Sequence, residues 1–297
     1  MKGPGRQIEV AVPAEPLEDL MRRIFFLLAL ILPLAGFTSA ERLFAPSADL
    51  WPRWQRHDAA NTAAIDYAAW DSLLRRVVVR GADDINRVDY LALAREQAAA
   101  LDQAVADLAA VEISRYDRAE QLAYWINLYN AVTLKVVADH FPVASIRDID
   151  ISPGWFADGP WDAELLTVEG EALTLNDIEH RILRPIWKDP RLHYAVNCAS
   201  LGCPNLAAEA YRNAGIEDRL NQAARAYVNH PRGVTIDGDK IVVSKIYDWF
   251  LEDFGGSTES LLAHLRQFAA PPLAAQLAEI SEIGGTAYDW SLNATGG

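Results

Sequence analysis

The sequence predicts an α+β fold that is mainly helical, with a small antiparallel sheet. The strongest apolar periodicity lies in residues 118–139, and other Ala- and Leu-rich stretches surround it. Runs typical of strands are few and clustered, in residues 161–175 and 234–244. No internal repeat or low-complexity tract interrupts this pattern. The chain beyond residue 40 is long enough for one sizeable domain or two small ones.

The N-terminal region has the layout of an export signal. Two arginines precede an apolar run from Ile24 to Leu34, and the small residues 38–40 are suited to cleavage. The run is short for a membrane span, and a retained membrane anchor is the alternative. We therefore expect residues 1–40 to be a signal peptide region whose true start is Met21, and a periplasmic or secreted mature protein.

The next segments are predicted to be helical. Residues 62–80 and 91–110 have the apolar spacing of amphipathic helices, so residues 41–110 form an N-terminal helical segment. In residues 118–139 the apolar side chains recur every three to four positions, and Phe141-Pro142 ends the helix. Its predicted buried face consists of Leu122, Trp125, Leu128 and Val132.

Two short elements are expected in the middle of the chain. Residues 161–175 are typical of a hairpin that turns near Glu169-Gly170. Asn176 and Glu179 have the spacing of a capping box that opens a short helix. Pro185 is expected to end or kink that helix near Arg184.

The remaining elements alternate between strand and helix. Leu192 to Cys198 is predicted to be a short buried strand, and residues 217–229 a helix. Val234 to Ser244 is predicted to be a hairpin around Asp237-Gly238. Residues 258–283 are predicted to be helical.

Charge and motifs narrow the classes of function. The formal net charge is -14, and residues 1–40 contribute nothing to it because their acidic and basic side chains cancel. Such an acidic chain argues against a nucleic-acid partner and against binding to anionic membranes after signal cleavage. The sequence has no Gly-rich phosphate loop, no His-Glu-x-x-His motif and no Gly-x-Ser-x-Gly motif. We expect no cofactor and no metal, and the oligomeric state stays open.

Both cysteines of the chain lie in one stretch, RLHYAVNCASLGCPNL, which also contains His193. In a strand, His193 and Cys198 would point to opposite faces. Cys203 precedes Pro204, which is favoured at the first position of a helix. The helix N-terminus would lower the pKa of the Cys203 thiol, and an imidazole would activate it further. Nearby backbone N–H groups would then form an oxyanion hole.

Other interpretations of these residues remain open. Cys198 is most simply a small apolar side chain, or the two cysteines form a disulfide. A zinc site from Cys198, Cys203, His193 and His180 has suitable ligand types but no standard spacing. Glu179 either orients the histidine or only caps Asn176.

Two asparagines and an arginine complete the candidate residues. Asn127 and Asn130 lie inside an apolar helix, so their amides either brace a loop or line a site. Arg191 follows a turn at Asp189-Pro190 and either pairs with nearby acids or contributes to binding.

Four motifs in order carry a family resemblance: YWINLYNAVTL, LNDIEHRILR, DPRLHYAVNCASLGCPNL and IYDWFLEDFG. With them the chain resembles the DUF547 family, here as an exported bacterial member, and the resemblance covers roughly Arg118 to Gly255. It implies that residues 111–297 are a DUF547-like domain that shares one continuous core with residues 41–110. The family was defined without a function. Its Cys-His arrangement is similar to that of papain-like and transglutaminase-like thiol enzymes.

By that resemblance the catalytic residues are Cys203, His193 and Glu179, and the substrate-binding residues are Asn127, Asn130, Cys198, Ser200 and Arg191. In papain-like order the nucleophile precedes the histidine, whereas here Glu179 and His193 precede Cys203. A permuted arrangement or an unrelated fold is therefore required.

The leading hypothesis is an exported thiol-dependent hydrolase or acyl transferase that acts on a peptide, an isopeptide, or a small amide or thioester. The alternative is a non-catalytic module that binds a peptide or a small thiol in the same cleft. A redox protein that uses Cys198 and Cys203 as an exchangeable pair ranks third, because the two lack Cys-x-x-Cys spacing.

Overall fold

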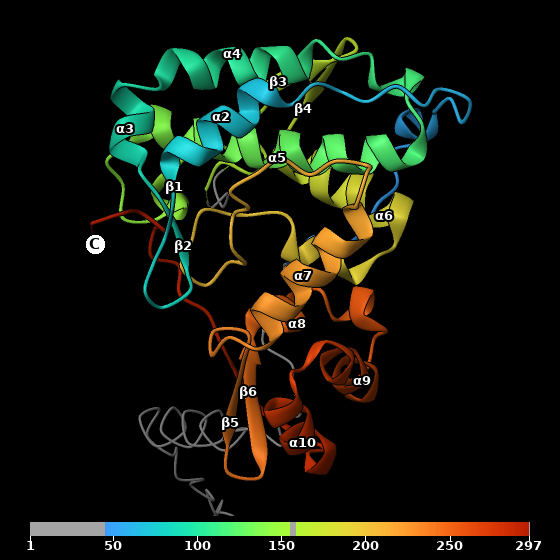
Figure 1. Ribbon diagram of the computed structural model, residues 1–297, viewed down its shortest axis with the longest axis vertical. Helices are drawn as coiled ribbons and strands as arrows, with labels where there is room; N and C mark the ends of the chain where they lie inside the picture. Colours follow the sequence, from blue (N-terminus) through green and yellow to red (C-terminus); the bar gives the residue numbers. More distant parts are fainter. Residues whose placement is uncertain (1–44, 155–158, 297) are drawn as a thin grey trace, which may run out of the picture. The chain divides into compact units, whose positions relative to one another are not determined.

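The computed structural model describes residues 45–154 and 159–296 (Figure 1). The expected signal region 1–40 lies outside the described residues. Within these ranges helices predominate, and the strands form three small sheets rather than one. Within the described ranges no helix is long and apolar enough to cross a membrane.

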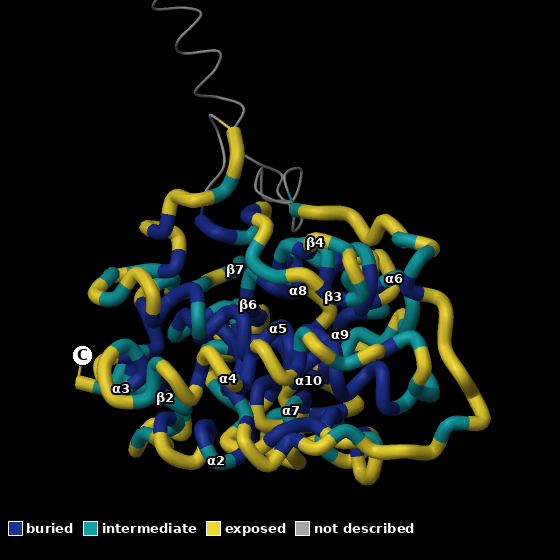
Figure 2. Tube along the Cα trace, turned by 90° about the horizontal axis from the view of Figure 1, so that it is seen from above, coloured by how far each residue is buried: buried dark blue, intermediate teal, exposed yellow. Residues whose placement is uncertain are grey.

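The central element is α5, which runs from Arg118 to His140 and confirms the predicted helix. It begins at Asp117, whose carboxylate accepts a hydrogen bond from the backbone N–H of Glu120, and it ends before Phe141. Most of its circumference is buried, as Figure 2 shows around the label α5. The predicted inner face is buried throughout: Leu122, Trp125, Leu128 and Val132. A helix enclosed on all sides can hold neighbouring elements on several faces at once.

The N-terminal helices are shorter than predicted. The structure has α2 (Ala68–Val77), α3 (Tyr90–Arg95) and α4 (Ala98–Ala109), which pack against one another and against α5 (Figure 1). Residues 78–80 leave the helix and form strand β1 (Val78–Arg80), paired with β2 (Asn86–Val88). Two β-branched valines before a glycine turn explain this change, because they favour an extended backbone. Short 3-10 turns, η2 (Pro52–Gln55) and η3 (Ile113–Arg115), flank these helices.

The hairpin predicted in residues 161–175 is confirmed as β3 (Leu166–Val168) and β4 (Glu171–Leu173). Its turn residues Glu169 and Gly170 both have positive φ, which is easily adopted by the glycine. A 3-10 turn, η4 (Ile146–Asp148), lies in the segment between α5 and this hairpin.

The next helix is capped two residues earlier than predicted. The Thr174 hydroxyl accepts the backbone N–H of Asp177, and the Asp177 carboxylate accepts the N–H of Thr174, which is a reciprocal cap. The predicted cap at Asn176 is therefore wrong, and its amide instead donates to the Asp162 carboxylate. This shift leaves the Glu179 side chain available for contacts outside its own helix.

This helix has π geometry over η5 (Asp177–Leu183) and continues as α6 (Arg184–Trp187). The change from π to α geometry falls at Arg184, directly before Pro185. Proline lacks an N–H and cannot complete the hydrogen-bond ladder of the preceding turn, so a change of geometry is expected there. π-Helical turns are uncommon and are frequent at functional sites.

The strand predicted from Leu192 to Cys198 is wrong. Residues Pro190–Tyr194 form a 3-10 helix, η6, whose first turn is capped by Asp189. Both a buried strand and a buried 3-10 turn are apolar, so composition alone could not separate them. The following loop extends to α7 (Ile216–Val228), which confirms the helix predicted at 217–229.

The C-terminal part contains a mixed sheet. Strands β5 (Val234–Asp237) and β6 (Lys240–Ser244) form the predicted hairpin, and β7 (Ile283–Ala287) adds in parallel to β6. The prediction of a small, purely antiparallel sheet is therefore wrong for this sheet. The segment 258–283, predicted to be helical, is instead divided into two helices and the start of β7. The helical elements of this part are α8 (Lys245–Trp249), η7 (Leu251–Phe254), α9 (Thr258–Phe268) and α10 (Pro271–Glu279).

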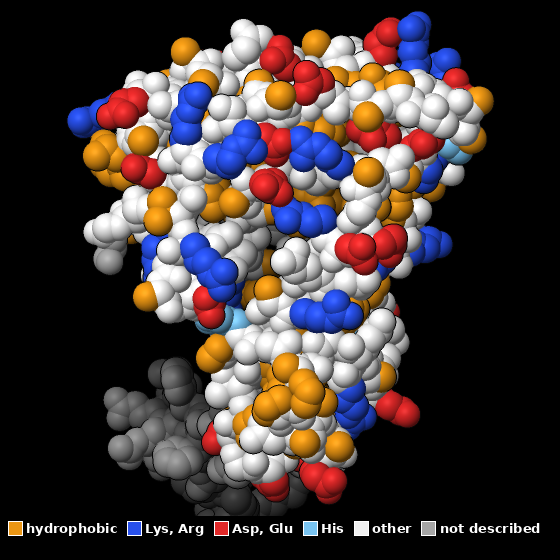
Figure 3. All heavy atoms as spheres, viewed as in Figure 1, with side chains coloured by type: hydrophobic (Ala, Val, Ile, Leu, Met, Phe, Trp, Pro, Cys, Tyr) orange, Lys and Arg blue, Asp and Glu red, His pale blue; other side chains and the backbone are white. Residues whose placement is uncertain are grey.

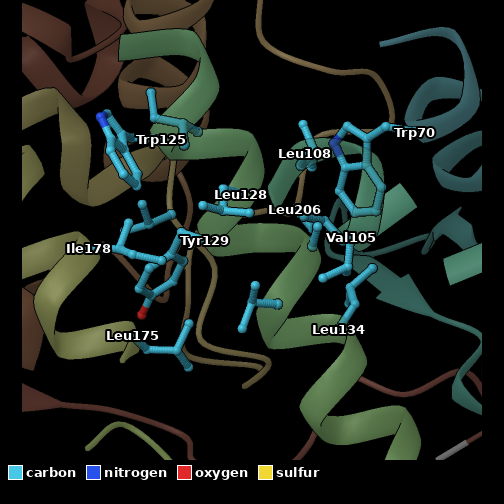
Figure 4. Close-up of a cluster of buried hydrophobic side chains, with 14 of the residues drawn as sticks. Trp70, Val105, Leu108, Trp125, Leu128, Tyr129, Leu134, Leu175, Ile178 and Leu206 are labelled. Atoms are coloured by element: carbon cyan, nitrogen blue, oxygen red, sulfur yellow. The ribbon is translucent and has the colours of Figure 1, made fainter. Parts of the chain in front are cut away.

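In the part of the chain that the structure describes, the buried apolar side chains form two clusters. The larger cluster surrounds α5 and combines residues from Trp54 to Leu292, so segments 41–110 and 111–297 contribute to the same core. In Figure 4, Trp125 and Tyr129 of α5 lie beside Ile178 of the π-helix. The smaller cluster joins α7 to the mixed sheet and to α9 and α10. On the face seen in Figure 3, basic side chains are interspersed with acidic ones over the helices.

Candidate functional site

A cavity of about 450 Å³ brings together residues from distant parts of the chain. The π-helix η5, the 3-10 helix η6, the loop after η6, helix α8 and the segment after β7 all contribute to its wall. Its chemically reactive lining residues are Glu179, His180, His193, Cys198, Cys203 and Tyr288.

His193 is held by contacts on both its ring face and its ring edge. The ring is stacked on Phe250, with centroids 4.3 Å apart and planes 10° from parallel. Its Nε2 lies 2.6 Å from Oδ2 of Asp253, and its Nδ1 lies 3.7 Å from Oε1 of Glu179. The imidazole therefore lies between two carboxylates, with Asp253 as its close hydrogen-bond partner.

Asp253 also bonds a buried arginine. Nε of Arg184 donates to the same Asp253 oxygen at 2.6 Å, and the Arg184 guanidinium lies over the Phe250 ring. Burial opposes ionisation of Asp253, but the hydrogen bonds from His193 and Arg184 outweigh it and lower its pKa well below the usual range. The carboxylate is therefore ionised at neutral pH and can accept hydrogen bonds from both His193 and Arg184.

Glu179 and His180 are adjacent on the π-helix, and both line the cavity. Burial lowers the pKa of His180 to about 4, so this imidazole is neutral at neutral pH. The second expected role of Glu179, capping Asn176, is excluded because the helix is capped at Thr174. On the other side, Tyr129 of α5 lies near Glu179, and burial together with that carboxylate raises the pKa of Tyr129.

The two cysteines are in contact. Their sulfur atoms lie 2.8 Å apart, and the backbone N–H of Cys198 donates to the Cys203 sulfur at 2.9 Å. Both are free thiols, and Cys203 is only 3% exposed, whereas Cys198 is partly exposed. The Cys198 sulfur also lies 3.0 Å from the Tyr288 hydroxyl and 3.5 Å from the Ser200 hydroxyl.

These contacts shift the pKa values of the two thiols in opposite directions. Burial would raise the pKa of Cys198, but hydrogen bonds from Cys203, and from the hydroxyls of Ser200 and Tyr288, outweigh it and lower the pKa. Burial raises the pKa of Cys203 well above its usual value, and the neighbouring Cys198 raises it further. Cys198 is thus the more acidic and the more accessible thiol.

Two expectations about Cys203, its place at a helix N-terminus and its lowered pKa, are therefore wrong. It does not lie at a helix N-terminus, because residues 204–215 are not helical and α7 begins at Ile216. Its pKa is raised rather than lowered. Its backbone N–H donates to the Ser200 carbonyl, so this group is not a free oxyanion-hole donor.

A tail far along the sequence fixes the cysteine loop. The backbone N–H of Leu201 donates to Ser291, and that of Gly202 donates to Asp289, each at 2.8 Å. A side chain at Gly202 would collide with the Asp289 backbone, which explains the glycine. Ala199, next to Cys198, has a φ of 60°, which is uncommon for a residue with a Cβ. This tail also carries Tyr288 into the cavity.

Three of the predicted substrate-binding residues make contacts within the protein. The Asn127 amide bonds both the N–H and the carbonyl of Tyr211, and the Asn130 amide bonds the Ala195 carbonyl and the Asn197 N–H. Arg191 pairs with Asp189 and with acidic and amide side chains of α7. None of the three lines the cavity. Both asparagine amides thus bond the backbone of the loops that they contact.

One wall of the cavity is aromatic. Ring centroids lie 4.9 Å apart for Trp249 and Tyr288, 4.8 Å for Tyr288 and Trp290, and 5.9 Å for Trp290 and Trp161. Arg147 lies over the Trp290 ring. This wall adjoins Cys198 through Tyr288 and presents large apolar surfaces to any bound group.

Two important residues were missed from the sequence. Asp253 lies within the motif IYDWFLEDFG. Its place as an acidic residue in a family motif is the signal that could have identified it. Tyr288 lies in a segment with no motif, and no sequence pattern indicates its position beside Cys198. Among the described residues, no group of three or more His, Cys, Asp or Glu side chains has the arrangement of metal ligands.

Comparison with known families gives one result for this chain. Residues 113–228 match the family described as "Protein of unknown function, DUF547". The DUF547 segment contains α5, the π-helix, His193 and both cysteines, whereas Asp253 and Tyr288 lie outside it. No curated protein and no solved structure matches the chain.

Proposed function

We propose that the cavity is the active site of a thiol-dependent hydrolase or acyl transferase. Its substrate is a peptide, an isopeptide, or a small amide or thioester. The observation that carries the proposal is that the Cys198 thiol and the His193 imidazole line the same cavity, and that Asp253 holds this imidazole by a hydrogen bond. A thiol, an imidazole and a carboxylate that orients the imidazole are the parts that acyl transfer through a cysteine requires.

Cys198, rather than Cys203, is the nucleophile in this proposal. Cys198 is more exposed, and hydrogen bonds lower its pKa, so more of it is thiolate at neutral pH. Cys203 contributes by donating a hydrogen bond to the Cys198 sulfur. The uncommon backbone conformation at Ala199 is consistent with a loop that presents its neighbour's side chain to the cavity.

His193 is the proton carrier, and Asp253 is its orienting partner. With Nε2 bonded to Asp253, the second nitrogen, Nδ1, faces Glu179, which also lines the cavity. No hydrogen bond joins His193 to either sulfur among the described side chains, so a substrate or water placed between them completes the relay. His193 protonates the leaving group after Cys198 attacks the carbonyl, and then accepts a proton from water in hydrolysis.

The Tyr288 hydroxyl is the proposed donor to the oxyanion that forms on the carbonyl carbon, because it lies 3.0 Å from the attacking sulfur. Along the chain the order is Glu179, His193, Cys198, Asp253. The proposal therefore includes a permuted arrangement of the groups found in papain-like and transglutaminase-like thiol enzymes.

The proposal also includes export. The pattern in residues 21–40 supports a periplasmic or secreted bacterial enzyme with a peptide or small-molecule substrate. The acidic net charge supports a site that takes neither nucleic acid nor an anionic membrane.

Acyl capture tests the proposal. The protein is incubated with a series of p-nitrophenyl esters and aryl thioesters, and the acylated residue is located by mass spectrometry after rapid acid quenching. We expect acyl groups on Cys198, none on Cys198→Ser at that position, and retained acylation in Cys203→Ser. His193→Ala and Asp253→Asn are expected to acylate at least tenfold more slowly.

Two variants serve as matched controls. His140→Ala and Asp239→Asn change exposed residues of the same types and should acylate at the rate of the unchanged protein. Circular dichroism checks that each variant is folded. Acylation on Cys203, or equal rates for His193→Ala and His140→Ala, would refute the mechanism. If no ester acylates Cys198 but peptides or small thiols protect it from alkylation, the non-catalytic binding module is the better description.

A further inference from the structure

The contact between the two sulfurs is more than acyl transfer requires. A single thiol suffices as a nucleophile, yet the Cys198 and Cys203 sulfurs lie 2.8 Å apart at the wall of the cavity. Cys198 is the accessible member and Cys203 is the buried one. This is the arrangement of an attacking thiol beside a resolving thiol.

We propose that Cys198 and Cys203 form a dithiol–disulfide couple that reacts with small-molecule disulfides. In the first step the Cys198 thiolate attacks one sulfur of the disulfide. A Cys198 mixed disulfide forms, and the other half of the small molecule leaves as a thiolate. In the second step Cys203 loses its proton and attacks the Cys198 sulfur, which forms the Cys198–Cys203 disulfide and releases the second small thiol. The protein dithiol loses two electrons and the small disulfide gains them.

The order of the two steps follows from access and charge. Both cysteines line the cavity, but Cys203 is buried and Cys198 is partly exposed, so a dissolved disulfide meets Cys198 first. Besides burial, it is Cys198 that raises the pKa of Cys203, through its hydrogen bond and its charge. Both effects disappear once Cys198 is in a mixed disulfide. The Cys198 backbone N–H, which donates to the Cys203 sulfur, then stabilises the thiolate that completes the second step.

The loop that carries the two cysteines favours formation of the Cys198–Cys203 disulfide from the mixed disulfide. Hydrogen bonds from Leu201 and Gly202 to the tail keep the loop in one conformation, and the Tyr227 hydroxyl bonds the Gly202 carbonyl at 2.6 Å. The two sulfurs are therefore already positioned as neighbours, so the second step needs little loss of conformational entropy. The mixed disulfide should be short-lived.

This couple has a consequence for the acyl-transfer chemistry, and that consequence rests on the proposed function. The disulfide uses the sulfur that would attack the carbonyl. An oxidised protein would then be inactive as a hydrolase, and reduction would restore it. The couple itself requires no acyl-transfer activity.

Oxidised glutathione is the probe for the test. The reduced protein is mixed with it, quenched with acid at intervals, and analysed by intact mass and peptide mapping. We expect the unchanged protein to lose two hydrogens and both reactive thiols, with little glutathione attached. Cys203→Ser should instead accumulate glutathione on Cys198, at least tenfold more than the unchanged protein. Cys198→Ser should react at least tenfold more slowly, and dithiothreitol should restore both thiols of the unchanged protein.

Two results would overturn the inference. One is a stable glutathione adduct on Cys198 in the unchanged protein, because Cys203 would then not resolve it. The other is equally fast glutathione attachment to Cys203 in Cys198→Ser. If a substituted protein fails to fold, the time course of the unchanged protein alone still separates a stable adduct from an internal disulfide.

The redox readout is independent of hydrolysis. A disulfide that forms in a protein that no ester acylates would support the couple and refute the proposed function. Ester acylation of Cys198 together with a stable glutathione adduct would support the proposed function and refute the couple.

Discussion

At the scale of residues, Tyr288 affects both the pKa of Cys198 and the space beside the Cys198 sulfur. Its hydroxyl contacts both the Cys198 sulfur and the Ser200 hydroxyl, and its ring belongs to the aromatic wall with Trp249. One side chain thus lowers the pKa of Cys198 and limits the space beside its sulfur. Removal of the oxygen alone separates these two effects.

Tyr288→Phe is predicted to slow alkylation of Cys198 several-fold at neutral pH. The ring is retained, but the hydrogen bond that stabilises the thiolate is lost, so the pKa of Cys198 should rise. The rate of labelling with iodoacetamide is measured against pH, with the label located by mass spectrometry. The labelling rates of Tyr288→Phe and of the unchanged protein should become equal at high pH, where Cys198 is ionised in both. A constant ratio at every pH would mean that the hydroxyl acts on access rather than on acidity.

The sequence identified the neighbourhood of the site better than the roles within it. His193, Glu179 and both cysteines, which lie in two of the four motifs, line one cavity. The roles of Cys198 and Cys203 depend on which sulfur is covered. The tail that covers their loop lies far along the chain: Tyr288, which contacts Cys198, is 90 residues away from it in sequence. Local spacing carries no information about a contact of that separation.

At the scale of elements, the π-helix decides where Glu179 points. A helix capped at Asn176 would have used the Glu179 carboxylate as the reciprocal cap. With the cap at Thr174, that carboxylate lies in the cavity, 3.7 Å from His193. The two possible caps were two residues apart, and the sequence contained suitable side chains for both.

Thr174→Ala is predicted to lower the free energy of unfolding by about 1 kcal/mol, because it removes the hydroxyl that caps Asp177. Asn176→Ala is the matched control, since its amide bonds an exposed aspartate and caps nothing, and it should cost less than about 0.5 kcal/mol. Urea unfolding followed by circular dichroism measures both. The cap assignment is wrong if the asparagine substitution costs more than the threonine substitution.

Helices and hairpins with strong local patterns were predictable. The apolar period of α5 and the turn residues of both hairpins are properties of short segments, and all three elements are confirmed. Strand β7 was not predictable, because Ile283–Ala287 is a glycine-containing segment with no strand pattern of its own. It becomes a strand only because β6 offers an edge to pair with.

At the scale of the whole molecule, buried histidines connect stability to pH. His180 lines the cavity, and His264 of α9 forms a hydrogen bond of 2.8 Å with the Tyr194 hydroxyl. Burial lowers the pKa of each to about 4 from the ordinary histidine value of 6.5. Because the unfolded chain binds these protons first, acid favours unfolding.

The free energy of unfolding is predicted to fall as the pH is lowered from 6.5 to 4, by about 3 kcal/mol for each buried histidine. His264→Gln keeps a hydrogen-bonding group near Tyr194 but cannot titrate. Its free energy of unfolding should therefore fall by about 3 kcal/mol less than that of the unchanged protein over the same pH range. Urea unfolding at a series of pH values measures the slope. His140→Gln, at an exposed site, should follow the unchanged protein, and equal slopes for all three would contradict the burial effect.

Processing of the N-terminus is the second prediction at this scale. We expect the mature chain to begin near Glu41, because residues 21–40 have the layout of a cleaved signal. Protein recovered from an exporting bacterial host is analysed by N-terminal sequencing. A mature N-terminus before Met21 would show that the segment does not act as a signal peptide.

The tail that carries Tyr288, and the turn that carries Asp253, both lie beyond the DUF547 segment at residues 113–228. A match to the DUF547 model and possession of this site are therefore separable traits. A homologue could match over the whole segment, retain the histidine and both cysteines, and still lack the carboxylate and the phenol. Such a homologue would be a pseudoenzyme under the proposed mechanism, and it could diverge freely toward ligand binding. Inspection of those two positions, rather than of the family match, would sort active from inactive members.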